Sequence, residues 1–412
     1  MEIYVYADWM QLPECQFIGT LHAIQTKGRK AFRFEYDKEW LKTHQNSFIL
    51  DPDLDFFSGS QYPINKENFG IFLDSMPDRW GRTLMQRKEN SLAKVEERRP
   101  RTLYDIDFLL GIYDTGRMGA LRFKTDRKGA FVNSDSSVPI PSWSSIKDLQ
   151  YSAVKIESED NNAAIKEHLA LLIAPGSSLG GARPKSNVLD EEGHPWIAKF
   201  PSKNDSINKA AWEYLAYQLA QRVGIEMAPC KIEQITRRHH TFFTKRFDRL
   251  VDKRIHFTSA MTMTGLDENI IKSNVPSYLD LVDTIENYSS HPTDDLKQLW
   301  LRIVFHICIS NTDDHLRNHG FILRDEGWRL SPAFDINPSI DKDGLALNIN
   351  EHDNSLDIEL AKSVGEYFRL SPTEMEKIIE LVTNTVSNWR LIATRIGISK
   401  KEQQLMSSAF IS

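Results

Sequence analysis

The chain has 412 residues, of which 41% are hydrophobic and 26% charged, and its formal net charge is −6 at pH 7. This composition is that of a soluble globular protein and excludes fibrous and wholly disordered chains. Any contact with nucleic acid would have to come from a local patch, because bulk nucleic-acid binders are usually basic. Three scattered cysteines are too few for a disulfide framework or a zinc site. No apolar stretch approaches the ~20 residues that span a bilayer, and the N-terminus lacks a leader pattern, so we expect a cytoplasmic protein without a membrane segment.

The first third of the sequence begins with strand-like segments rich in β-branched and aromatic residues. These segments are residues 2–7, 17–23 and 29–36. A short helix over residues 37–43 should follow, with its first residue, an aspartate, as N-cap. Residues 72–81 are expected to form a polar and aromatic loop that leads into a helix from about Arg82. The Ser- and Pro-rich residues 133–145 are interpreted as a linker, which closes an N-terminal subdomain over residues 1–135.

The middle third changes character and predicts a mixed subdomain over residues 146–246. A helix is expected over residues 165–174, where Pro and Gly then stop it. The apolar spacing of residues 207–223 predicts a second helix, and Gly224 stands where a C′ glycine belongs. The expected strands are residues 186–189, 196–200, 231–235 and 241–246.

The last third, residues 247–412, is predicted to be mainly helical. Residues 296–309 carry apolar side chains on nearly every face, which indicates a buried helix. A polar run follows it, and amphipathic helices, including residues 372–387, close the sequence. Between them, a hairpin is expected from residues 321–323 and 328–330.

A loop rich in glycine and serine, residues 177–185, precedes two of the predicted strands. Glycine lets a backbone approach a phosphate closely and point several N–H groups at it. The loop equally suits a plain helix-to-strand connection, and it lacks the Walker pattern. Lys199 lies in the strand one hairpin later, and Glu213 lies on the next helix. In kinases a strand lysine in this order binds phosphates and pairs with such a glutamate, although each residue alone could be an ordinary surface residue.

The densest polar cluster is residues 311–318, with Asp335 seventeen residues after Asn318. Phosphoryl transfer needs a carboxylate that accepts the proton of the attacking hydroxyl, together with an Asn and an Asp that hold Mg²⁺. Asp313 and Asn318 have the spacing of the protein-kinase catalytic loop, and Asp335 follows a hairpin as its metal-binding Asp does. A polar helix C-terminus with local capping is the plainer interpretation of the same residues.

Other interpretations of these residues fit less well. Asp313, Asp314 and His315 could bind a hydrolytic metal, but no second His/Asp pair completes such a site. Ser178 with His315 and an aspartate could form a triad, but there is no Gly-x-Ser-x-Gly elbow. Two basic stretches, residues 94–101 and 237–240, are interpreted as a solvated helix end and an exposed turn, although either could touch nucleic acid or a partner.

Taken in order, these segments resemble the HipA family of bacterial toxin serine/threonine kinases over nearly the full length. The segments that carry the resemblance are residues 76–81, 178–185, 197–201, 246–249, 311–318 and 334–335. The resemblance implies an α+β, two-lobed protein-kinase-like fold related to phosphoinositide kinases. In this fold an extra N-terminal β-rich subdomain (1–135) precedes a kinase N-lobe (146–246) and a mainly helical C-lobe (247–412) that carries the catalytic loop.

The resemblance also implies roles for single residues. Asp313 is implied as the catalytic base, Asn318 and Asp335 as Mg²⁺ ligands, and Glu213 as the partner of Lys199. The residues implied in ATP binding are Gly180, Gly181, Ala182, Arg183, Lys185, Lys199, Lys245, Phe247, His315, Asn318 and Asp335. Ser178, or its neighbour Ser177, is implied as an autophosphorylation site that silences the enzyme by drawing the glycine loop away from ATP.

The activity implied by the resemblance is ATP- and Mg²⁺-dependent phosphorylation of a protein substrate by a growth-inhibiting toxin. An aminoacyl-tRNA synthetase is a substrate type of the family, and a small helix-turn-helix antitoxin is its usual partner, through which DNA is contacted only indirectly. Two alternatives stay open: a nucleotide-binding corepressor that bridges DNA-bound antitoxin, and a small-molecule or lipid kinase on the same fold.

Overall fold

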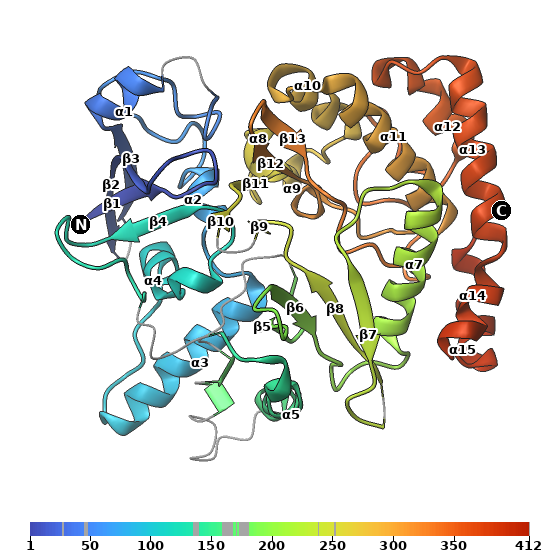
Figure 1. Cartoon of the computed structure of the whole chain (residues 1–412), viewed down its shortest axis with the longest axis horizontal. Helices are drawn as coiled ribbons and strands as arrows, with labels where there is room; N and C mark the ends of the chain where they lie inside the picture. Colours follow the sequence, from blue (N-terminus) through green and yellow to red (C-terminus); the bar gives the residue numbers. More distant parts are fainter. Residues whose placement is uncertain are drawn as a thin grey trace. The chain divides into compact units, whose positions relative to one another are not determined.

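The structure is a computed structural model that describes residues 1–26, 29–44, 48–134, 140–158, 168–169, 171–172, 181–237, 239–250 and 253–411 (Figure 1). The chain forms two compact units, Met1–Asn204 with Phe243–Thr258 and Asp205–Phe242 with Ser259–Ser412. The subdomain boundaries predicted at residues 135–146 and 246 stay predictions. Across the ranges described, no helix combines the length and the apolar character needed to cross a membrane.

The first unit begins with an antiparallel sheet in the order β3-β2-β1-β4. Its strands are β1 (Glu2–Ala7), β2 (Gln16–Thr26), β3 (Arg29–Tyr36) and β4 (Leu121–Lys124). Ile3, Val5 and Ala7 are buried on one face of β1, as the period of two in a strand requires. Gly19 lets β2 approach β3, since a Cβ there would lie 2.3 Å from the carbonyl oxygen of Glu35. The three strands predicted here are confirmed.

Five helices of the first unit lie within its described residues. They are α1 (Lys38–Thr43), α2 (Gly70–Asp74), α3 (Arg79–Val95), α4 (Asp105–Gly111) and α5 (Ile146–Glu157). The predicted cap of α1 is confirmed, since the Asp37 carboxylate accepts from the amides of Glu39 and Trp40. The predicted linker is structured at its end, where a 3-10 turn, Trp143–Ser145, leads directly into α5.

The loop predicted over residues 72–81 is shorter in the structure, and the helix predicted from about Arg82 begins earlier. Residues 72–74 belong to α2, and α3 already starts at Arg79. The reason is Asp78, whose carboxylate accepts the amide hydrogen of Gly81 at 2.8 Å and so caps α3 three residues earlier. Capping by aspartate is a local signal that places the start of the helix at Arg79.

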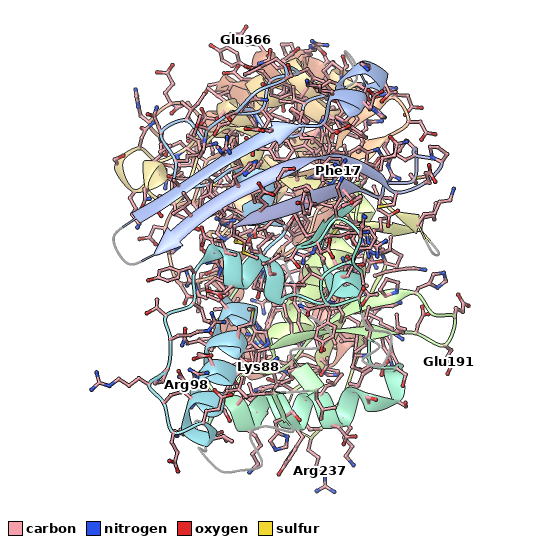
Figure 2. The ribbon with its side chains drawn as sticks, turned by 90° about the vertical axis from the view of Figure 1, so that its left-hand side faces the viewer. Phe17, Lys88, Arg98, Glu191, Arg237 and Glu366 are labelled. Carbon is pink, nitrogen blue, oxygen red and sulfur yellow. The ribbon has the colours of Figure 1, made fainter. Side chains whose placement is uncertain are left out.

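The rest of the first unit contains an antiparallel hairpin of β5 (Lys185–Leu189) and β6 (Pro195–Lys199). Figure 2 shows Glu191 at the outer turn of this hairpin. The strand β8 (Thr241–Lys245) neighbours β6, and the chain returns to the first unit at its Phe243. Shorter strands follow at β9 (Arg249–Leu250), β10 (Lys253–Arg254) and β11 (Phe257–Ser259). The strands predicted at residues 186–189, 196–200 and 241–246 are confirmed within one residue, and the helix predicted at 165–174 lies largely outside the described residues.

The second unit is mainly helical, as predicted. Its described helices are α7 (Lys209–Val223), α8 (Ala260–Met263), α9 (Ile270–Ser273), α10 (Tyr278–Tyr288), α11 (Pro292–Cys308), α12 (Ile358–Ser363), α13 (Pro372–Ser387), α14 (Trp389–Ile396) and α15 (Lys400–Leu405). Its strands are β7 (Cys230–Glu233), β12 (Gly320–Arg324) and β13 (Gly327–Leu330), of which the last two form the predicted hairpin.

The core of the second unit is built on α11, which is buried on nearly every side. Leu299, Trp300 and Ile303 of this helix are all fully buried, which confirms the predicted buried helix. In Figure 1, α13 and α14 lie alongside α7, and both contact it. Trp389 of α14 stacks on Phe410 with ring centroids 4.2 Å apart. These contacts pack α13 and α14 against α7.

Candidate active site

The polar loop after α11 begins with a turn at Ser310, whose φ is +49°. The loop then enters a 3-10 turn, Leu316–Asn318. The Asp313 side chain is 76% exposed, and its nearest cation is the exposed Lys342, whose Nζ lies 3.7 Å from Oδ1. Because an exposed ion pair of this kind contributes little stability, the Asp313 carboxylate is available to an incoming hydroxyl group.

The neighbouring carboxylate, Asp314, is buried instead. Its Oδ2 accepts hydrogen bonds from the Tyr278 hydroxyl at 2.5 Å, from His306 Nδ1 at 2.9 Å and from His319 Nε2 at 2.8 Å. Burial opposes ionisation of this carboxyl, but its interactions with the two histidines outweigh burial and hold the Asp314 pKa well below its usual range. Asp314 therefore ties the loop to α10 and α11, and this anchor leaves Asp313 facing solvent.

Asn318 closes the loop and presents an open acceptor. Its Nδ2 donates to the Asp313 carbonyl oxygen at 3.0 Å, and its amide donates to the His315 carbonyl oxygen at 2.7 Å. Its Oδ1 is buried and accepts no hydrogen bond from the described residues. A buried amide oxygen that is fixed in orientation and lacks a donor suits a hard cation such as Mg²⁺.

Asp335 has a backbone conformation that is uncommon outside glycine, with φ of +58°. Asn337, which the sequence did not single out, donates its Nδ2 to Asp335 Oδ1 at 3.3 Å. The amide of Asn337 also donates to Asn311 Oδ1 at 3.3 Å. Asn337 thus links Asp335, the predicted metal ligand, to Asn311 at the start of the polar loop after α11. Asp313, Asn318 and Asp335 all belong to the second unit. The side-chain oxygens of Asn318 and Asp335 suit a divalent cation, and the Asp313 carboxylate suits a proton acceptor.

In the first unit, the described end of the glycine loop is held by the segment that caps α3. The Lys185 ammonium is buried and lies 2.8 Å from Asp78 Oδ2. Burial, above all, raises the pKa of Asp78 above its usual value. Trp80 adds two hydrogen bonds, from its amide to the Gly181 carbonyl oxygen at 3.4 Å and from its indole to the Lys185 carbonyl oxygen at 3.1 Å. The sequence marked both segments but gave no sign that they bind one another.

The other predicted ATP-binding residues of the first unit are placed as follows. Ala182 is exposed, and Arg183 donates to the Phe200 carbonyl oxygen at 3.4 Å. Lys199 is the last residue of β6 and stands opposite Lys185 in the β5–β6 register. Lys245 ends β8, and the Phe247 ring packs 5.8 Å from that of Phe257. Gly180, Ser177 and Ser178 lie outside the described residues. In the second unit, Glu213 is buried on α7.

Residues 246–249 form a charge cluster around the buried carboxylate of Asp248. Asp248 is fully buried and binds the side chains of Arg246, with contacts of 2.8 and 2.6 Å, and of Arg249, at 2.6 Å. Burial alone would raise the pKa of Asp248, but the two guanidinium groups outweigh it and hold that pKa at about 2. Asp248 Oδ2 also accepts the amide hydrogen of Gly119 at 2.8 Å, and Arg246 donates to the Arg117 carbonyl oxygen at 2.9 Å. The cluster locks the returning chain onto residues 116–119.

The two basic stretches lie where they were expected. Residues 94–101 span the end of α3, where Arg98 pairs with Glu89 at 2.5 Å and with Glu96 at 2.6 Å. Arg237 is exposed, and Figure 2 shows its side chain projecting at the edge of the molecule. The residue that follows Arg237 lies outside the described residues.

Comparisons with known proteins agree with this fold. A family model described as HipA-like C-terminal domain matches residues 177–389, more than half of the chain. Among solved structures, the fold is similar to HipA from Shewanella oneidensis, determined as a toxin–antitoxin complex with HipB and operator DNA. The TM-score is 0.67 at 16% identity, with 99% of this chain and 94% of that chain covered. The predicted mixed α+β fold of the HipA type is thereby confirmed.

A curated relative from Sinorhizobium fredii, named "Putative kinase Y4mE", is 24% identical over 149 residues. The match covers 34% of this chain and 34% of the relative, so it spans about a third of the relative's length. The family model extends further, from the glycine loop through the polar loop after α11 and Asp335 to the start of α14. On the strength of that match, this chain belongs to the HipA family.

Proposed function

We propose that the chain is an ATP-dependent serine/threonine protein kinase that acts as the toxin of a toxin–antitoxin pair. The observation that carries this proposal is the loop after α11, which exposes the Asp313 carboxylate and buries that of Asp314. In the proposed reaction, Asp313 orients a substrate hydroxyl and accepts its proton, while the hydroxyl oxygen attacks the γ-phosphorus of ATP and ADP leaves. Asn318 and Asp335 hold Mg²⁺, which neutralises the charge of the phosphates.

The residues of the first unit are proposed to bind the nucleotide. Backbone groups of the glycine loop would face the phosphates, and Lys199 would pair with them, as a strand lysine does in kinases. We assign Lys185 a structural role in place of the ATP contact that the resemblance implies. Its ammonium already has a buried partner in Asp78, so it supports the loop and leaves phosphate contact to Gly180, Gly181, Ala182 and Arg183. Lys245 and Phe247 are proposed at the adenine, His315 at the nucleotide, and Glu213 as the partner of Lys199.

The proposed metal site predicts that ATP binding depends on Mg²⁺. Asp335→Ala should weaken Mg²⁺-ATP binding roughly tenfold or more, because a triphosphate would then face the remaining acidic groups with less charge compensation. Isothermal titration with and without excess chelator measures this effect. The exposed Asp343→Ala, nearby in the sequence, is the matched control and should bind as wild type. Equal ATP affinity in the presence and absence of Mg²⁺ would mean that Asn318 and Asp335 are not metal ligands.

We also propose that the enzyme silences itself by phosphorylation in the glycine loop. A phosphoserine at Ser178 or Ser177 carries roughly −1.5 to −2 charges and would repel the triphosphate beside it, while Arg183 could pair with it. We expect mass spectrometry to find phosphate at one of these serines in the active protein and none in Asp313→Asn. Phosphate on the Asp313→Asn protein, made in a host without related kinases, would refute self-modification.

The proposed partners follow from membership of the HipA family. We propose a helix-turn-helix antitoxin as the regulator, DNA contact only through it, a cytoplasmic location and a protein substrate, for which an aminoacyl-tRNA synthetase is the first candidate. The test of the proposed function is incubation of the full chain with labelled ATP and a cell lysate, followed by identification of the labelled protein. Labelling that requires Asp313 supports a protein kinase, whereas ATP turnover without any labelled protein would point to a small-molecule or lipid acceptor.

A further inference from the structure

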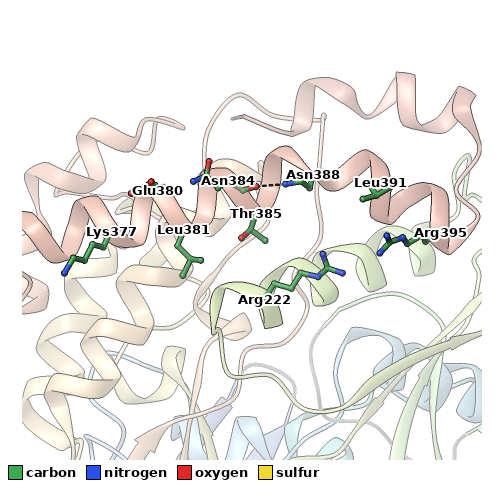
Figure 3. Close-up of a pocket in the computed structure, with 9 residues that line it drawn as sticks. All are labelled: Arg222, Lys377, Glu380, Leu381, Asn384, Thr385, Asn388, Leu391 and Arg395. Carbon is green, nitrogen blue, oxygen red and sulfur yellow. Dashed lines mark hydrogen bonds between the residues drawn. The ribbon is translucent and has the colours of Figure 1, made fainter.

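A polar groove of about 610 Å³ runs along the second unit between the end of α7 and the helices α13 and α14. Figure 3 shows Lys377, Leu381, Thr385, Asn388, Leu391 and Arg395 following one another along α13 and α14, with Arg222 of α7 on the opposite wall. This volume is within the range of ligand-binding sites in proteins. None of the residues to which the proposed kinase reaction assigns a role lines the groove.

The groove brings together three cationic side chains, those of Arg222, Lys377 and Arg395. Among the residues that the structure describes, no carboxylate oxygen lies within 4.0 Å of a charged nitrogen of Arg222, Lys377 or Arg395. Elsewhere on the surface, exposed arginines such as Arg369 and Arg98 are paired with glutamates. The chain as a whole is acidic, with a net charge of −6, but the residues lining this groove include three cations and one carboxylate, that of Glu380, which leaves a local surplus of positive charge. A ligand with carboxylates would supply the missing partners.

The groove offers apolar contacts as well as charged ones. Leu381 and Leu391 line it and are 45% and 54% exposed. Exposed leucines at a charged groove can bury area against apolar side chains of a ligand and contribute nothing to a phosphate backbone. Glu380 also lines the groove, near Lys377, and a carboxylate there disfavours nucleic acid. At the other end of the groove, Arg222 and Arg395 supply positive charge with no lining carboxylate beside them.

We propose that this groove binds a short peptide segment of a partner protein that carries acidic and leucine-like side chains. From Lys377 to Arg395 the helices rise at most about 27 Å, at 1.5 Å per residue. An extended peptide of about eight residues covers that length, at 3.3 Å per residue. The carboxylates would pair with Arg222 and Arg395, and the apolar side chains would pack on Leu381 and Leu391. Asn384 offers its side-chain amide to the peptide backbone, whereas the Asn388 Nδ2 already donates to the Asn384 carbonyl oxygen at 2.8 Å, so Asn388 offers its Oδ1 as an acceptor.

The test measures fluorescence polarisation of labelled octapeptides with the full chain. One peptide alternates glutamate with leucine, a second alternates lysine with leucine, and a third alternates glutamate with serine. We expect saturable binding of the first, at least roughly tenfold weaker binding of the other two, and loss of affinity as salt is raised. The double variant Arg222→Gln/Arg395→Gln should lose roughly tenfold or more in affinity for the first peptide. Lys401→Gln, an exposed lysine that does not line the groove, should bind as wild type.

Any one of the following results would overturn the proposal. It fails if the glutamate–leucine peptide shows no saturable binding up to about 1 mM, a limit chosen because specific peptide sites bind more tightly than that. It also fails if the lysine–leucine peptide binds equally well, or if the double variant binds as wild type. A single-stranded DNA oligonucleotide that binds more tightly and displaces the peptide would make the groove a phosphate-binding surface instead. Since the substituted side chains are exposed, unchanged thermal unfolding of the variants checks that the fold is intact.

Discussion

Asp313→Asn is expected to lower phosphoryl transfer to protein substrate by roughly 10²–10⁴-fold, the usual contribution of a general base. The loss should fall on kcat, because the carboxylate acts on the acceptor hydroxyl while other groups hold the nucleotide. ATP affinity should therefore change little. The fold should also survive, since the Asp313 side chain is 76% exposed and its one ion pair, with Lys342, is a surface pair.

The measurement is single-turnover transfer from labelled ATP, together with calorimetric ATP binding. Asp343→Asn changes an exposed aspartate nearby in the sequence and serves as the matched control. The assignment of Asp313 as the base is contradicted if Asp313→Asn keeps a rate within about fivefold of wild type, since that is well below what a general base supplies. A loss of ATP binding in this variant would instead point to a role in holding the nucleotide.

Asp248→Asn is expected to destabilise the first unit by about 3–5 kcal/mol. The substitution leaves two guanidinium groups, of Arg246 and Arg249, buried without their counter-charge, and removal of one partner from a buried ion pair costs that much. The Gly119 amide donates to Asp248 Oδ2 at 2.8 Å and reports on this site directly. Its hydrogen exchange should accelerate roughly 10²–10³-fold or more, at about 1.4 kcal/mol for each factor of ten.

The pH dependence of this effect has a definite sign. The folded-state pKa of Asp248 is about 2, below the value of about 3.9 in an unfolded chain. The charged carboxylate therefore contributes about 2–3 kcal/mol of stability above pH ~5, and most of this contribution is lost as pH falls through the range from about 4 to 2. The difference between wild type and Asp248→Asn should shrink over that window. Glu191→Gln, at an exposed hairpin turn, should show neither effect. Unchanged protection of Gly119 in Asp248→Asn would contradict the structural role given to the cluster.

The sequence predicted those elements whose signals are local. The spacing of apolar residues identified α7, and Gly224 ends that helix with φ of +87°, as its place in the sequence indicated. The hairpin β12–β13 was recognisable because a turn with Gly327 joins two apolar strands. The order of Asp313, Asn318 and Asp335 was equally readable, since it depends on spacing along the chain.

What the sequence did not reveal depends on residues far apart in the chain. Asp313 and Asp314 are chemically identical neighbours, and partners elsewhere in the chain, among them Tyr278 on another helix, hold Asp314 and not Asp313 in the interior. The bond between Lys185 and Asp78 joins residues that are 107 positions apart. No local pattern encodes such a pairing, because a buried lysine looks the same in sequence as an exposed one.

The buried cluster around Asp248 also bears on how the protein is made. The carbonyl groups of Gly116 and Arg117 and the amide of Gly119 are bound by Arg246 and Asp248, which the ribosome adds about 130 residues later. At about 5–20 residues per second, that interval is roughly 7–26 s. During this time the N-terminal sheet can pair its strands, but residues 116–119 have no native partners for these groups. The first unit can therefore be completed only after all of α7 and the strands β7 and β8 have been synthesised.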